Sequence, residues 1–310
     1  MKRINTKLKI CILLSLLLIT TGCAKTLVDE NKKVVKNEST GQTLTSNILC
    51  RPTNPTTKKI YEEHKVNLKK LPECSNFQIT SGKYEGLWTS FFVKPLAYIL
   101  LVLGNFVKNY GLSVIIVTIV IRLLAFPITK KTAMQSEMMK KAQPELNKLQ
   151  KKYEGKQDSE SVMKQNQEMM AIYKKYNINP MAGCLFAFLQ LPIFIAFFEA
   201  VQRTPVIFED KFLGLQLGTT PSVGITTNMF YAYLILMICI GVTTFFSLKM
   251  NAATSEDNPS MKMMPTMMTV MIIVTAIFMP TGLGIYWVTS NIFTMVQNIL
   301  VKRSKENGKA

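Results

Sequence analysis

The stretch GLSVIIVTIVIRLLAFPITKK, residues 111–131, places one arginine in the middle of an otherwise apolar run. The 17 residues from Leu112 to Ile128 are about the minimum for a membrane-spanning helix, and Arg122 carries the only formal charge among them. An arginine at the centre of such a helix costs roughly 2.5–3.5 kcal/mol on insertion scales. Arg122 is therefore predicted to face protein or water and to mark a functional site.

Composition favours a membrane protein with several spans over a soluble globule. The chain has 310 residues, 48% of them hydrophobic, with 37 Lys+Arg against 19 Asp+Glu and a single histidine. Its mean hydropathy is positive, and its five long apolar runs would find no soluble core large enough to hold them. The predicted class is an all-α polytopic membrane protein with basic flanks.

The first 22 residues have the features of an export signal. A basic start is followed by the apolar run Ile10–Ile19 and by Thr20-Thr21-Gly22-Cys23, which resembles the site where a bacterial lipoprotein signal is cleaved and its cysteine acylated. Thr20 departs from that pattern, which prefers leucine. An uncleaved anchor and a plain signal peptide cleaved nearby are the alternatives. Residues 1–22 are predicted to be a lipoprotein signal peptide and Cys23 the lipidation site.

Residues 23–85 are polar and lysine-rich, with prolines that break any long helix. They are predicted to form a weakly ordered, lipid-anchored tether outside the cell. Cys50 and Cys74 lie in this segment, where a disulfide is permitted and would contribute on the order of 3 kcal/mol. The sequence leaves open whether they are bonded. Cys184 and Cys239 sit in apolar runs as inert thiols, and no Cys or His spacing indicates a metal site or a cofactor.

Residues 86–108 are apolar but interrupted by polar residues and a proline. Only 12 residues separate Pro95 from Lys108, which is about 18 Å of helix and too short to cross roughly 30 Å of hydrocarbon. An interfacial amphipathic helix on the outer surface of the membrane is predicted here.

The core, residues 109–302, is predicted to contain five spans, at 112–128, 181–201, 228–248, 263–279 and 283–301. Segment 129–179 is basic and indicates a cytoplasmic hairpin of two helices, 132–153 and 160–176. Gly155 and an N-cap at Asp158 or Ser159 would separate these helices. A short basic tail, 303–310, follows the last span. The charge pattern predicts a cell-membrane protein with its mature N-terminus outside and its C-terminus in the cytoplasm.

Polar residues within the spans gather at similar depths. Gln190 lies about 13 Å into the second span, and Arg122 lies about 15 Å into the first from the other side. The fifth span carries a polar stripe. For any one residue of this stripe, interhelical hydrogen bonding is the alternative to a functional role. The stripe, at three- and four-residue steps, consists of Trp287, Ser290, Asn291, Thr294, Gln297 and Asn298.

No acidic residue sits at the centre of any predicted span. Glu199 lies near the outer end of the second span and is placed to pair with Arg203 at i+4. Arg122 therefore needs water or polar side chains around it. A hydrated groove between the first, second and fifth spans is predicted.

Three segments closely resemble one family. They are TIVIRLLAFPITKK with Arg122, NINPMAGCLFAFLQLPIFIAFFEAV with Pro180, Gln190 and Pro192, and GLGIYWVTSNIFTMVQNIL with Trp287. They look like the YidC/Oxa/Alb membrane protein insertases, in particular the five-span lipoproteins of Gram-positive bacteria. The likeness runs from about residue 88 to residue 302. It implies a five-helix bundle with a hydrophilic groove open to the cytoplasm and to lipid, roofed by the outer helix and served by the cytoplasmic hairpin.

The resemblance implies a protein that inserts and helps fold nascent membrane proteins, alone or with the Sec translocon, and that is not an enzyme. Its implied partners are nascent membrane proteins and the lipid bilayer, with the Sec translocon, the signal recognition machinery and the ribosome as further candidates and no direct nucleic-acid substrate. The short tail argues against the ribosome contacts of relatives with long tails. The groove residues expected, centred on the arginine, are Arg122, Gln190, Trp287, Thr118, Ser290, Asn291 and Thr294.

Two other classes remain open from the residues alone. A small transporter or channel would predict charged pairs or broken helices at corresponding places in internal repeats, and no repeat is seen in the sequence. A structural assembly scaffold would share the fold but would not need Arg122. An enzyme is disfavoured because the lone histidine, His64, lies in the exported segment and no Ser, Cys or carboxylate constellation appears.

Overall fold

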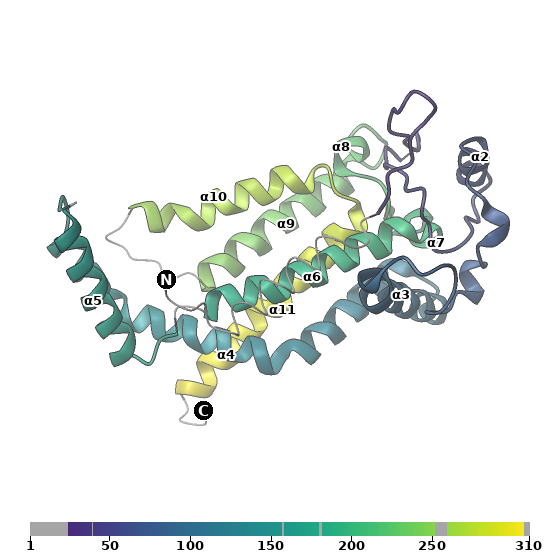
Figure 1. Ribbon diagram of the computed structural model, residues 1–310. Coiled ribbons are helices and arrows are strands. Elements are labelled where there is room, and N and C mark those ends of the chain that lie inside the picture. The colour runs from purple at the N-terminus through teal and green to yellow at the C-terminus, as the bar shows by residue number, and fades with distance from the viewer. Residues whose placement is uncertain (1–23, 39, 157, 180–181, 252–258, 307–310) are drawn as a thin grey trace. The chain divides into compact units, whose positions relative to one another are not determined.

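The computed structural model describes residues 24–38, 40–156, 158–179, 182–251 and 259–306. The predicted signal peptide, the predicted lipidation site Cys23 and the end of the predicted tail, 307–310, lie outside these residues. The described chain is mostly helical (Figure 1). It divides into two compact units. The first unit holds the chain up to Val117 with Leu191–Leu234 and Phe278–Ile285, and the second holds Thr118–Gln190, Ile235–Ile277 and the chain from Tyr286 onward.

Long helices run through both units. They are α3 (Lys94–Val107), α4 (Tyr110–Lys152), α5 (Ser159–Lys175), α6 (Ala182–Arg203), α9 (Phe230–Asn251), α10 (Pro259–Ala276) and α11 (Thr281–Glu306). Shorter helices are α2 (Pro55–Glu63), α7 (Pro205–Glu209) and α8 (Pro221–Gly224), with single turns at Leu68–Lys70 and Cys74–Asn76. The predicted mostly helical fold is confirmed. The prediction of an all-α chain missed a small antiparallel hairpin, β1 (Lys211–Phe212) and β2 (Leu215–Gln216).

Three of the described helices are long and apolar enough to cross a membrane, at Thr89–Val107, Tyr110–Lys152 and Phe230–Asn251. The other predicted spans fall on α6, α10 and α11, so each of the five overlaps a helix. The helix at Thr89–Val107 contains a π-helical turn, Thr89–Val93, that leads directly into α3, with a proline in the first turn of α3. The helix is therefore 19 residues long, and the prediction that its length is too short to span is wrong.

Helix α4 runs unbroken for 43 residues, through Pro127 and Pro144. The predicted first span, 112–128, and the predicted first hairpin helix, 132–153, therefore lie on one continuous helix. The second hairpin helix, α5, begins as predicted: Gly155 has φ 78°, and the side chain of Asp158 caps the helix by accepting from the backbone N–H of Ser161. Figure 1 shows α5 next to the C-terminal end of α4.

The two hairpin helices pack through a small apolar core. Ala142, Leu146 and Ile178 are buried in it, with Met138 and Tyr173 among the residues packed around them. Some apolar side chains of α5 do not join this core. The exposed ones are Val162, Met163 and Met170.

The prediction that residues 24–85 are weakly ordered is wrong for the described part of this segment. Isolated β-bridges join Thr26 to Thr45 and Lys36 to Thr43, and they order a segment that the sequence shows only as polar. Phe208 of α7, far away in the sequence, completes the core beneath them. The buried members of this core are Leu27, Leu44, Ile48, Tyr61, Leu68 and Phe208.

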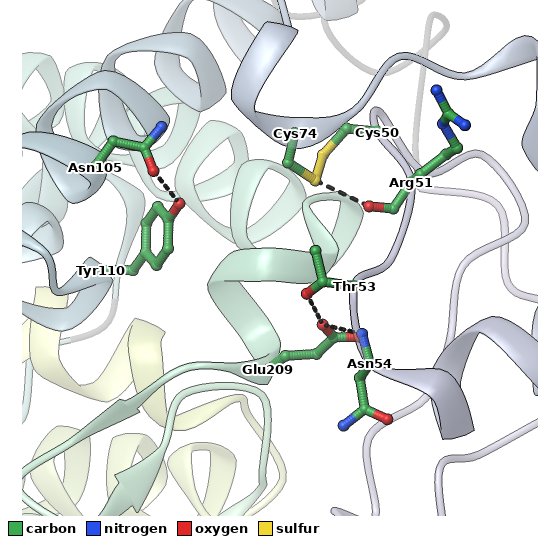
Figure 2. Close-up of a disulfide and its surroundings, with 8 residues drawn as sticks. All are labelled: Cys50, Arg51, Thr53, Asn54, Cys74, Asn105, Tyr110 and Glu209. Carbon is green, nitrogen blue, oxygen red and sulfur yellow. Dashed lines mark hydrogen bonds between the residues drawn. A yellow bond between two sulfur atoms is a disulfide. The ribbon is translucent and has the colours of Figure 1, made fainter.

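A disulfide joins Cys50 to Cys74, whose Cα atoms are 4.9 Å apart, a pairing that the sequence leaves open (Figure 2). Nearby, Glu209 of α7 holds the start of α2. Its Oε2 accepts from Thr53 Oγ1 at 3.1 Å and from the backbone N–H of Asn54, the N-cap residue of α2, at 3.3 Å. Burial raises the pKa of the Glu209 carboxyl. The disulfide and this carboxylate both fix residues 50–74 in the first unit.

Arg203, at the end of α6, is fully buried and lies between two carboxylates. Its Nη1 is 3.5 Å from Glu199 Oε2, which confirms the predicted i, i+4 pair. Its Nη2 contacts the carboxylate of Glu85, and its Nε donates to the carbonyl oxygen of Asn47 at 2.8 Å. Glu199 in turn accepts from Trp88 Nε1 at 2.9 Å. Arg203 thus ties the N-terminal segment to α6 within the first unit.

Arg203→Met should lower the free energy of unfolding of the first unit by about 3–5 kcal/mol, because two carboxylates would lose their buried cation. Thermal unfolding of the purified chain in detergent measures this loss, with the protease resistance of residues 24–85 as the readout. Lys59→Met is the matched control, since Lys59 pairs with Glu63 at an exposed site and such pairs contribute about 0–1 kcal/mol. Equal losses in the two variants would show that the Arg203 cluster is not a structural anchor.

A polar cavity as the candidate functional site

A cavity of about 290 Å³ lies within the second unit. Helices α4, α6, α9, α10 and α11 all contribute to its wall. Among the described lining residues, Arg122 is the only one with a formal charge. The polar lining residues are Arg122, Thr129, Thr132, Ser136, Gln190, Thr244, Ser247, Asn251, Tyr286, Trp287, Ser290, Asn291, Thr294, Gln297 and Asn298.

Helical periodicity explains why these side chains share one cavity. Residues three or four apart lie on the same face of a helix, and the polar residues of α11 follow those steps for three turns. The opposite face of α11 carries Ile292 and Ile299, both exposed. The same spacing places Ser247 and Asn251 in line on α9. Helices α9 and α11 therefore each turn a row of polar side chains to the cavity, and the exposed face of α11 opposite that row is apolar.

Arg122 is 8% exposed, and neutral groups from two other helices hold its guanidinium. Its Nη2 donates to Gln190 Oε1 at 2.7 Å and also to Ser290 Oγ. Gln190 Nε2 donates in turn to Tyr286 Oη at 2.7 Å. Because no described residue that lines the cavity is acidic, the lining satisfies hydrogen bonds of the guanidinium without supplying an opposite charge.

Further hydrogen bonds join the same helices. Thr244 Oγ1 of α9 accepts from Trp287 Nε1 at 3.0 Å and from Asn291 Nδ2 at 2.9 Å. Thr129 Oγ1 of α4 donates to Gln297 Oε1 at 3.0 Å. The bond from Asn298 Nδ2 to Asn251 Oδ1 measures 3.1 Å. Polar side chains thus bridge α11 to both α4 and α9 along the cavity.

Six of the seven groove residues expected from the sequence line this one cavity, namely Arg122, Gln190, Trp287, Ser290, Asn291 and Thr294. Thr118 is buried one turn before Arg122 and is not among the lining residues. Sequence reasoning assigned the groove to the first, second and fifth spans only. The structure adds α9, on the third predicted span, and one residue of α10.

Several lining residues were missed by sequence reasoning. Thr244, Ser247 and Asn251 recur at steps of three and four on α9, and this signal was available within an apolar run. Thr129 and Ser136 likewise continue the Arg122 face of α4 beyond the predicted end of the first span. Tyr286 gave no comparable signal, because an aromatic residue at that position is equally typical of ordinary helix packing.

The cavity offers groups that can bind polar or negatively charged ligands. It offers one positive charge and many groups that donate and accept hydrogen bonds, but no described lining residue is a Cys, His, Asp or Glu. Across the described part of the chain, no group of three or more His, Cys, Asp or Glu side chains is placed to hold a metal ion. Fold and site together define a helical membrane protein with a polar, positively charged cavity.

Comparison with known proteins identifies the family. A family model described as "60Kd inner membrane protein" matches residues 102–308. "Membrane protein insertase YidC 2" of Bacillus anthracis is 38% identical over 232 residues, which cover 74% of this chain and 87% of that protein. "Membrane protein insertase MisCA" of Bacillus subtilis (strain 168) is 41% identical over 217 residues, 69% of this chain and 79% of that protein. This chain belongs to the YidC family of membrane protein insertases, as its sequence motifs predict.

A solved structure shares the fold. "Active YidC insertase crystal structure with the first transmembrane domain resolved" matches with a TM-score of 0.53 at 21% identity. The match covers 78% of this chain and 52% of the solved chain, so this protein spans about half the length of that one.

Thr244→Val should lower stability by about 1–2 kcal/mol, because it keeps the side-chain shape but removes the acceptor of two donors, on Trp287 and Asn291. Thermal unfolding in detergent measures the loss. Thr269→Val is the matched control, since the buried Thr269 Oγ1 donates within its own helix, α10, to the carbonyl oxygen of Pro265 at 2.7 Å. Similar losses at both positions would mean that the α9–α11 bridge contributes nothing specific.

Proposed function

We propose that this protein is a membrane insertase and chaperone, which inserts nascent integral membrane proteins and helps them fold, alone or with the Sec translocon. The observation that carries the proposal is the position of Arg122. It lies on a helix long and apolar enough to span a membrane, yet its guanidinium reaches a polar cavity with neutral partners. The names of the relatives support the same function.

In the proposed mechanism, the charge of Arg122 attracts the short polar, often acidic, segment that a nascent protein must send across the membrane. Two unit charges 4 Å apart interact by about 4 kcal/mol at an effective dielectric constant of 20, against about 1 kcal/mol in water. A hydrated cavity that holds such a charge also shortens the low-dielectric distance left to cross. No covalent step is needed.

The apolar part of the substrate follows the outside of the same helices. Leu123 and Leu124 of α4 are 56% and 76% exposed, and Val296 and Leu300 of α11 are 50% and 54% exposed. These side chains form apolar faces on the two helices that hold Arg122 and Ser290. A substrate helix sliding along them passes into lipid, and hydrophobic partitioning drives its release.

The hairpin of α4 and α5 is the proposed first contact for substrates or for the targeting machinery. Its exposed Met163 and Met170 have the adaptable, polarisable side chains that suit varied apolar segments. In the proposed topology the hairpin and the C-terminus are cytoplasmic, five helices span the cell membrane, and Cys23 carries a lipid outside after removal of residues 1–22. The basic charge of 129–179 and the signal-like pattern around Cys23 support this arrangement.

Arg122→Ala should abolish complementation of an insertase-depleted strain for at least some substrates, with a drop of at least about tenfold in insertion of substrates with acidic translocated segments. Arg122→Lys should retain activity, because the positive charge is what the mechanism needs. Protease protection of pulse-labelled substrates measures insertion. Lys130→Ala is the control, because it removes a charge from the same helix outside the cavity. Full activity of Arg122→Ala on every substrate would leave the electrostatic mechanism without support.

A single cysteine introduced in 129–179 should resist a membrane-impermeant thiol reagent added outside the cell and should react after permeabilisation. The proposed cytoplasmic location of the hairpin is the reason for this expectation. Mass-shift labelling of intact cells measures it, with a cysteine in 203–226 as the exterior control. Strong labelling of the hairpin in intact cells would invert the proposed topology.

A further inference from the structure

The donors and acceptors around Arg122 fix the direction of one amide group. A guanidinium has only donors, so Gln190 must turn its Oε1 toward Arg122, at 2.7 Å from Nη2. The amide nitrogen of Gln190 then faces the other way and donates to Tyr286 Oη, at 2.7 Å. The tyrosine hydroxyl therefore stands at the far end of a chain of hydrogen bonds that ends on the arginine.

Tyr286 also shares a helix with Ser290, a second neutral partner of Arg122. Tyr286 and Ser290 are one turn apart on α11, and their side chains interact as well. Because Ser290 accepts directly from Arg122 and Tyr286 acts through Gln190, α11 holds the guanidinium by two routes. Tyr286 itself is only 2% exposed, so it offers little surface to anything that enters the cavity.

We propose that Tyr286 is a positioning residue: its hydroxyl holds the amide of Gln190, which keeps the guanidinium of Arg122 directed for the capture of acidic segments. This inference rests on the proposed function and assigns to it a residue that does not itself contact the substrate. The competing explanation is a structural bond between α6 and α11 that stabilises the bundle and affects every substrate alike. The two explanations differ in how Tyr286→Phe should act on substrates of different charge.

The test uses the full chain in proteoliposomes and two single-span reporters, identical except that the translocated segment contains two Asp or two Asn residues. Tyr286→Phe removes one oxygen and leaves the ring in place. Because one hydrogen bond contributes about 0.5–1.5 kcal/mol, it should reduce insertion of the acidic reporter about 2- to 10-fold more than insertion of the neutral reporter. Protease protection of the reporters measures both rates.

Two further variants separate positioning from folding. Tyr233→Phe is the matched control, since Tyr233 is 3% exposed, lies outside the cavity lining and accepts from the backbone N–H of Gln216 at 3.3 Å. It should affect the two reporters equally. Gln190→Ala breaks the bridge itself and should show the same preference for the acidic reporter. Adding Tyr286→Phe to Gln190→Ala should then reduce insertion by less than about 2-fold further.

Equal losses on the two reporters in Tyr286→Phe, or no loss, would overturn the inference. An undiminished effect of Tyr286→Phe in the Gln190→Ala background would do the same, because the hydroxyl would then act without Gln190. Arg122→Ala on the same reporters separates this result from the proposed function. If Arg122→Ala lowers insertion of the acidic reporter while Tyr286→Phe does not, only the positioning role fails. If Arg122→Ala has no effect on either reporter, the proposed function fails as well.

Discussion

The second unit depends on holding the positive charge of Arg122 on an apolar helix, in a cavity whose described lining contains no acidic residue. Insertion of an arginine at that depth costs roughly 2.5–3.5 kcal/mol, and a buried carboxylate would be the usual way to reduce this cost. The cavity around Arg122 instead offers amide and hydroxyl oxygens, from Gln190 and Ser290. These groups accept hydrogen bonds from the guanidinium and carry no formal charge themselves. The polar stripes on α4, α9 and α11 follow from that requirement.

The first unit shows the opposite solution with the same residue type. Arg203 is fully buried between Glu199 and Glu85, and its charge is matched by carboxylates. Such an arrangement fixes the chain, because separating the partners would expose uncompensated charges to a low dielectric. The chain therefore uses one buried arginine to hold the N-terminal segment in place. In the proposed function it keeps the other, Arg122, to attract a ligand.

The sequence predicted best what repeats along a helix. The stripe on α11 and the depth of Gln190 were both readable, because a period of three to four residues in an apolar run is a local signal. The order of the first unit could not be predicted from the sequence, because its core joins Leu27 and Leu44 to Phe208 across most of the chain. The low local hydrophobicity of its N-terminal segment is typical of disorder. Tyr286 was missed because only the direction of the Gln190 amide, a property of the folded site, shows what its hydroxyl does.

In the proposed function, the neutral hydrogen-bond partners in the cavity would also be easily exchanged while a substrate is inserted. Hydroxyl and amide groups both donate and accept hydrogen bonds, so Thr244 or Gln190 can exchange a protein partner for water or for a nascent chain. Interhelical hydrogen bonds of this kind contribute on average only about 0.6 kcal/mol in membranes, whereas breaking a buried ion pair costs about 3–5 kcal/mol. A site that must bind and release many different segments is therefore better built from such groups around a single charge than from charge pairs.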